Sequence, residues 1–228
     1  MSNLYQYASP GVHAQRGLTL VEILVALVIS AFLIAGVIQL FVGSKQTYRG
    51  HDALSRIQEN GRLALDNMAR DIRMAGYAPF DPASPATLGP PVVSGNPAQI
   101  RVRWRDPGTG PLQCNPADGS GICDRTYSIV CRGGETPPCT GINMGDLMVQ
   151  HELVGGTQSL IEGVADMRIT NLVNSIRIDL LLVSLDRFVA TAPQTVTFPP
   201  GADPANNYTA PDRRLVQVFS TTVAIRNR

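Results

Sequence analysis

The residue most in need of a chemical partner is Glu22, a carboxylate at the front of a long apolar stretch. Residues 23–42 read ILVALVISAFLIAGVIQLFV, and Glu22 is the only charged residue between Arg16 and Lys45. An ionised carboxylate inside a membrane costs about 2.5–3.5 kcal/mol on insertion scales unless it is paired or lies near the interface. Glu22 therefore needs either a position shallow enough to reach lipid headgroups or a positive partner.

Cleavage of the chain would create such a partner. Gly17 lies five positions before Glu22, and cleavage between Gly17 and Leu18 would leave a cationic amine on Leu18, one helical turn from the carboxylate. That amine, on the same chain or on a neighbouring one, could neutralise Glu22 in a dry environment.

The second group of reactive residues is a set of four cysteines in one loop-rich segment, Cys114, Cys123, Cys131 and Cys139. They contain no Cys-x-x-Cys pair and enclose no histidine, so a zinc site is not expected. Beyond a membrane anchor, an even number indicates two disulfides made in an oxidising compartment, with three possible pairings. Short loops favour Cys114–Cys123 and Cys131–Cys139, each contributing roughly 2–3 kcal/mol. The oxidising compartment also places this segment outside the cytoplasm, whereas the flanking charges do not settle orientation.

No arrangement of residues predicts catalysis. The three histidines are scattered along the chain, and the common nucleophile, metalloprotease and phosphate-binding glycine motifs are absent from the sequence. The net charge of +1, with basic residues spread out, gives no argument for nucleic acid. We expect no enzyme activity, no cofactor, no metal and no nucleic-acid partner.

The element that must position Glu22 is a helix. Residues 18–43 make about 26 residues, roughly 39 Å at 1.5 Å per residue, which exceeds a hydrocarbon core of about 30 Å and allows a tilted span. The apolar core of a secretory signal peptide is shorter, about 7–15 residues. Residues 1–17 are a polar leader.

The helix is expected to continue beyond the membrane. No proline occurs between Ser44 and Gly76, and Gly76 followed by Pro79 indicates the stop. Apolar residues recur with a period of 3.6, which predicts one stripe packed on a folded head. The stripe consists of Leu54, Ile57, Leu65, Met68, Ile72 and Ala75, with Gly61 in the gap.

The remainder is predicted to be a β-rich head, giving an α+β fold in which the long helix packs on an antiparallel sheet with disulfide-braced loops. In Gln99–Arg105 a period of two places Arg101, Arg103 and Arg105 on one face, either a solvated face or a phosphate- or lipid-facing patch. Ser175–Leu185 loses its alternation, which predicts a strand covered on both faces, one of them by the long helix. Further strands are expected at Thr126–Arg132, Asp146–Leu153, Met167–Thr170 and Arg214–Ile225.

Gly17-Leu18-Thr19-Leu20-Val21-Glu22, with the apolar run behind it, resembles the signature of prepilins of type IV pili and type II secretion. Phe is usual at the first mature position, so Leu18 is a mild departure. The resemblance implies cleavage between Gly17 and Leu18 by a prepilin peptidase and N-methylation of Leu18. It also implies that Glu22 and Thr19 serve filament assembly.

A second resemblance is to the PilW family of minor pilins. It covers Ile57–Leu65, Ala69–Tyr77, Ile161–Val164 and Asp212–Asn227, with departures at Ala78–Phe80 and Asn171–Ser175. It implies a type IV pilin-like fold and a low-copy minor pilin that primes pilus assembly near the tip. The implied partners are the major pilin and other minor pilins. The precursor would be a single-pass inner-membrane protein with a periplasmic head, moving to the pilus after assembly.

The expected organisation is a cleaved leader (1–17), a membrane and filament-core helix (18–43), an amphipathic helix (44–76) and a β-rich head (77–228). The nearer alternative is a minor pseudopilin of a type II secretion system. The distant alternative is a membrane-tethered periplasmic binding protein or enzyme, which predicts an intact leader and a preformed pocket with convergent polar groups.

Overall fold

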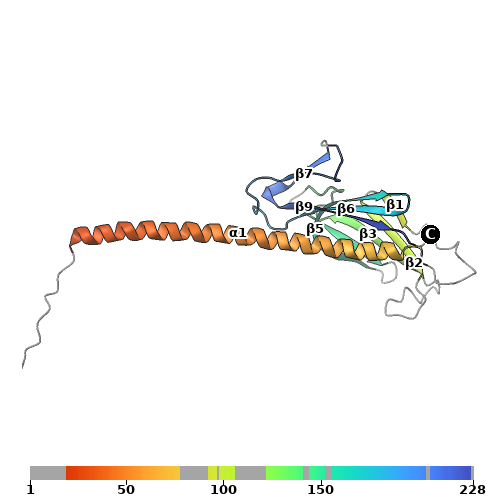
Figure 1. Cartoon of the computed structure of the whole chain (residues 1–228), viewed down its shortest axis with the longest axis horizontal. Coiled ribbons are helices and arrows are strands. Elements are labelled where there is room, and N and C mark those ends of the chain that lie inside the picture. Colours follow the sequence, from red (N-terminus) through yellow and green to blue (C-terminus); the bar gives the residue numbers. More distant parts are fainter. Residues whose placement is uncertain are drawn as a thin grey trace, which may run out of the picture. The chain divides into compact units, whose positions relative to one another are not determined.

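The chain forms one long helix and a β-rich head. The computed structural model describes residues 19–77, 92–96, 98–105, 122–140, 144–151, 156–203 and 206–226. The chain divides into two compact units, Met1–Gln46 and Thr47–Arg228. Helix α1 (Leu20–Met74) runs through the boundary, and all described strands belong to the second unit (Figure 1). This confirms the predicted α+β class.

The strands of the head form a large sheet and a separate hairpin. In the part of the chain that the structure describes, the sheet has seven strands in the order β1-β2-β3-β4-β5-β6-β9, and all neighbouring pairs are antiparallel. Strands β7 and β8 form the two-stranded hairpin. The bounds are β1 (Val92–Asn96), β2 (Gln99–Arg105), β3 (Ile122–Cys131), β4 (Gly145–His151), β5 (Gly156–Asn171), β6 (Ser175–Val183), β7 (Thr195–Thr197), β8 (Asn207–Thr209) and β9 (Val216–Ala224), with a 3₁₀ turn η2 (Pro211–Arg213) before β9.

Both ends of α1 have recognisable caps. The Glu22 amide donates to the hydroxyl of Thr19 at 3.3 Å, as in the Thr-x-x-Glu capping box. At the other end Gly76 has φ 73°, the left-handed conformation that commonly terminates a helix. The predicted stop at Gly76 is therefore confirmed.

The face of α1 that lies on the sheet is built mainly from small residues and a few large ones. The predicted stripe is wrong at Leu54, which is 38% exposed, while the adjacent Ala53 is buried. The buried residues Ala53, Ile57 and Gly61 follow one another at helical spacing, so the buried face is centred nearer Ala53 and Leu54 lies at its margin. The buried helix residues are Ala53, Ile57, Gly61, Ala64, Met68, Ala69, Asp71 and Ile72.

At Gly61 the helix packs directly against a side chain of the sheet. A Cβ added there would lie 2.6–2.7 Å from three atoms of the Phe219 ring of β9. Real Cβ atoms do not come this close, so the residue type at position 61 sets the separation of helix and sheet.

Replacing Gly61 by alanine is expected to destabilise the head despite alanine's better helix propensity. Overpacking costs about 1–3 kcal/mol, whereas the propensity gain is about 1 kcal/mol. The denaturant midpoint of the detergent-solubilised full chain should therefore fall. Gly50→Ala is the matched control, because its nearest neighbouring atom would lie at 3.9 Å; it should be neutral or stabilising. Equal midpoints for the two variants would contradict the close packing.

Strand β6 is covered on both faces, as predicted from its lost alternation. Ile176, Ile178, Leu180 and Leu182 belong to the main core, which also contains the α1 residues. Leu181 and Val183 belong to a second core that includes residues of the hairpin segment. The members of this second core are Met144, Ala165, Leu181, Val183, Phe198, Tyr208 and Ala210.

Several strand bounds differ from those predicted. Strand β3 begins at Ile122 rather than Thr126, and β5 starts at Gly156, far before Met167. The β5 ladders shift register near Gly163, which has φ 81°. Glycine is common in turns, but Gly163 instead forms an irregularity within a continuous strand. Strands β1, β7 and β8 were not predicted, because they lie in Pro79–Pro97 and Ala192–Pro211, where frequent Pro, Gly and Asn residues indicate loops.

Candidate assembly interface

The first part of α1 has no protein covering it. Every residue from Leu20 to Arg49 is exposed, including Phe32 and Leu40 at 77% each. An 18-residue window here has a mean hydropathy of 2.8. Within the described residues, α1 is the one helix long and apolar enough to cross a membrane. An apolar surface on all sides must be covered by lipid or by other apolar helices.

Glu22 lies in the first turn of this apolar helix. The positive end of the helix dipole favours a carboxylate there. Thr19, which was expected to serve assembly, caps the helix. Its hydroxyl accepts from the Glu22 backbone amide, and its carbonyl oxygen accepts from the backbone amides of Glu22 at 3.1 Å and Ile23 at 3.2 Å. The capping sequence Thr-x-x-Glu was a signal that sequence reasoning missed. Gly17 and Leu18 lie outside the described residues, so their roles stay predictions.

A buried ion pair joins α1 to the sheet. Asp71 is 1% exposed, and both of its carboxylate oxygens accept from Nη1 of Arg125 on β3, at 2.9 and 3.0 Å. The hydroxyl of Tyr127 also donates to Asp71. Burial first, and then the neighbouring carboxylate, raises the pKa of Tyr127. These contacts fix α1 against β3.

Asp71 was missing from the predicted helix stripe. Its sequence signal was its spacing, three residues after Met68 and four before Ala75, which places it among the apolar residues of the stripe. A carboxylate at such a position requires a buried cation or donor. Only the folded sheet supplies that partner.

The arginine row of β2 is partly neutralised. Arg103 pairs with Asp124 at 2.8 Å, and Arg101 pairs with the same carboxylate. Asp124 itself is 5% exposed. Of the two interpretations of the row, these ion pairs favour a polar sheet face over a phosphate- or lipid-binding patch.

A disulfide braces the loop after β3. Cys131 and Cys139 are bonded, with Cα atoms 5.4 Å apart, in agreement with the expected pairing. Cys123 is also disulfide-bonded, and Cys114 lies outside the described residues. Gly145 permits the brace, because an added Cβ would lie 2.6 Å from the Cys139 sulfur.

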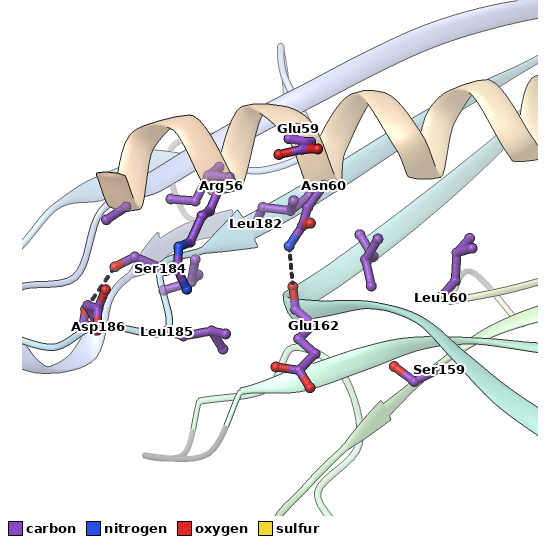
Figure 2. Close-up of a pocket in the computed structure, with 14 residues that line it drawn as sticks. Arg56, Glu59, Asn60, Ser159, Leu160, Glu162, Leu182, Ser184, Leu185 and Asp186 are labelled. Carbon is purple, nitrogen blue, oxygen red and sulfur yellow. Dashed lines mark hydrogen bonds between the residues drawn. The ribbon is translucent and has the colours of Figure 1, made fainter. Parts of the chain in front are cut away.

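The described part of the head contains a groove of about 510 Å³ between α1 and the sheet (Figure 2). Its polar groups are largely engaged within the protein. Asn60 donates to the Glu162 carbonyl at 3.4 Å, Arg56 pairs with Asp52 at 3.0 Å, and the Ser184 hydroxyl donates to a backbone carbonyl. The groove lining contains no histidine or cysteine to act as a base or nucleophile. Among the described residues, no group of three His, Cys, Asp or Glu side chains could hold a metal ion.

The second core contains a buried tyrosine, Tyr208, that should contribute to the loss of stability at alkaline pH. The Tyr208 hydroxyl donates to the Cys139 carbonyl at 3.1 Å, and burial raises the pKa of Tyr208 to about 12. In the unfolded chain this tyrosine has its ordinary pKa of 10.0 and loses its proton first, so stability falls as pH rises from 10.0 towards about 12.

Tyr208→Phe should therefore make the free energy of unfolding less dependent on pH above 10.0, the ordinary pKa of tyrosine. Denaturant titrations of the full chain at neutral and alkaline pH measure this. Tyr48→Phe, at a tyrosine 74% exposed, is the control and should leave the slope unchanged. The same slope in Tyr208→Phe and the unmodified chain would contradict the prediction.

The amino-terminal segment has a recognisable family signature. A family model described as the prokaryotic N-terminal methylation motif matches residues 12–38. No curated protein and no solved structure matches the chain. The motif supports a type IV pilin-like or pseudopilin-like protein, a structural protein rather than an enzyme. It implies processing by a prepilin peptidase and association with pilins. With the apolar half of α1, it is consistent with membrane anchoring and incorporation into a pilus.

Proposed function

We propose that this chain is a minor pilin that helps prime type IV pilus assembly and enters the pilus near its tip. The observation that carries the proposal is the methylation motif at residues 12–38, most of which lies on an apolar helix whose residues 20–49 are all exposed. The resemblance of residues 57–65, 69–77, 161–164 and 212–227 to the PilW family supports the minor-pilin role. A minor pseudopilin of a type II secretion system shares the same anchor and head class and is the second candidate.

In this mechanism the apolar half of α1 exchanges contact with lipid for contact with the helices of neighbouring subunits. In the inner membrane the precursor is anchored by residues 18–43, with its head in the periplasm. A prepilin peptidase removes residues 1–17, and Leu18 is methylated. The mature helix then leaves lipid and packs against the helices of neighbouring subunits. Lipid is as apolar as leucine, so hydrophobicity alone does not drive this step, and packing must contribute.

The remaining contribution to the free energy of assembly comes from Glu22. Its carboxylate, in the first turn of α1, pairs with the Leu18 amine of a neighbouring subunit and is thereby neutralised. Because Glu22 lies only four positions after Leu18 in the sequence, this pair also sets the axial register between subunits. Thr19 supports it by holding the first turn, as its capping hydrogen bond indicates.

Amino-terminal mass spectrometry of the protein from membranes and from sheared filaments tests the proposal. We expect a methylated Leu18 start in the filament fraction, and an uncleaved chain that is absent from filaments in a Gly17→Val control. A functional protein that retains Met1 would support the tethered binding protein or enzyme instead. A processed protein found only in short periplasmic filaments would support the pseudopilin.

A further inference from the structure

Among the strands that the structure describes, β9 stands at an edge of the large sheet and pairs with β6 alone. It follows β6 at the end of the strand order. Its residues pair with β6 continuously from Val216 opposite Val183 to Ala224 opposite Ser175, without a bulge.

Three hydrogen bonds fix which residues of β9 point away from β6. The Leu215 carbonyl accepts from the Ser184 amide at 2.8 Å, and the Ile225 amide donates to the Asn174 carbonyl at 3.1 Å. Odd-numbered residues therefore direct their backbone groups towards β6. The amide of the even-numbered Val216 points the other way, donating to the Gln194 side chain at 2.8 Å.

The next even-numbered residues present a row of outward backbone donors and acceptors. No residue that the structure describes forms a backbone hydrogen bond with these outward groups. Three of the residues, Ser220, Thr222 and Ala224, are also exposed. The row consists of Val218, Ser220, Thr222 and Ala224.

Strand β9 lacks the features that normally protect an open edge. Its sequence VQVFSTTVA has no charged residue, no proline and no glycine. Natural edge strands are usually interrupted by charges, proline or bulges, because a long regular edge recruits other strands. The opposite edge, β1, does have a register irregularity, between Val93 and Asn96.

We propose that the β9 edge binds an extended segment of a different protein, which adds an eighth strand to the sheet. The outward backbone groups supply the affinity. The side chains of these even-numbered residues are small or β-branched, and the whole strand is uncharged. The segment that fits them is therefore itself uncharged, rich in β-branched residues and free of proline. This partner contact goes beyond the helix-mediated assembly proposed above, and only the preference for a different protein over a second copy rests on the proposed membrane anchoring.

A second copy of this chain is a poorer occupant. Antiparallel pairing, as in every other pair of this sheet, would relate two β9 strands by a two-fold axis perpendicular to the sheet. That axis reverses every direction within the sheet plane, including the direction of the α1 segment lying on it. The two helices would then begin at opposite ends, which is incompatible with anchoring both copies in one membrane.

Amide hydrogen exchange of the full-length chain tests the proposal. It is measured in two preparations, namely native membranes or filaments, and monomers dispersed in detergent. In the monomer, the amides of Ser220, Thr222 and Ala224 should exchange rapidly and those of Thr221 and Val223 slowly. In the native preparation the outward amides should slow by at least ~10-fold. Equal exchange of the outward amides in both preparations would overturn the proposal. Protection accompanied by a dimer of this chain alone would replace the partner with a second copy.

Variants at Thr222 separate the backbone from the side chain. Thr222→Pro removes one outward amide, whereas the control Thr222→Ala keeps it, so only the first should abolish the native protection. Thr222→Glu is a second variant that keeps the test valid if the proline prevents folding. Its carboxylate lies opposite Arg177 in the β6–β9 ladder, so pairing with β6 is retained. It also places a charge on the β9 edge, which opposes the addition of another strand. It should also lose the protection. Unchanged protection of the remaining outward amides in both the Thr222→Pro and Thr222→Glu variants would overturn the proposal. Leader cleavage tests the proposed function separately, so its outcome does not alter this conclusion.

Discussion

Replacing Asp71 by asparagine should destabilise the head by about 3 kcal/mol or more. Removal of one partner from a buried ion pair typically costs about 3–5 kcal/mol, because the other charge stays buried. Arg125 is 24% exposed, so water relieves part of this cost and the lower end applies. The measurement is the denaturant midpoint of the detergent-solubilised full chain, followed by the near-ultraviolet signal of Trp104, which lies under Arg125.

Two further variants isolate the charge. Tyr127→Phe removes one hydrogen bond but leaves the ion pair, and it should cost about 1–3 kcal/mol. Asp66→Asn, at an exposed position of the same helix, should change stability by less than about 0.5 kcal/mol. An Asp71→Asn variant no less stable than Asp66→Asn would show that the buried pair does not hold α1 to the sheet.

Replacing Glu22 by glutamine should reduce incorporation into filaments by about tenfold or more, since even about 1.4 kcal/mol per contact corresponds to a factor of ten. Glutamine is of similar size but cannot neutralise the Leu18 amine. Leader cleavage should stay largely intact, because the scissile bond precedes Leu18. Quantitative immunoblotting of sheared filaments against membranes, combined with amino-terminal mass spectrometry, measures both effects.

Glu22→Asp is the matched control, because it keeps the negative charge and should retain more incorporation than glutamine. Thr19→Val removes only the capping hydroxyl, for which a loss of about 1 kcal/mol of helix stability is expected. Normal incorporation of the Glu22→Gln variant would remove the proposed charge pairing and leave helix packing as the sole source of assembly energy.

The fold was largely predictable where periodicity is regular. Alternation identified β2, and the loss of alternation in Ser175–Leu185 correctly indicated a strand covered on both faces. The long β5 was missed because Gly163 adopts a positive φ within it, so a residue typical of turns occurs inside a strand. Leu54 was assigned to the buried stripe because periodicity alone does not decide which of the adjacent residues Ala53 and Leu54 faces the sheet.

By itself, the sequence determined the features that depend on neighbours along the chain. The membrane-length apolar run, the motif around Gly17 and the stop at Gly76 need no tertiary contact, because hydropathy, peptidase recognition and helix capping are local properties. The tertiary structure alone decided that Asp71 meets Arg125, that Gly61 meets Phe219, and that β9 lies at an open edge. Each of these depends on which strands become neighbours, and that is set by packing the whole sheet against α1.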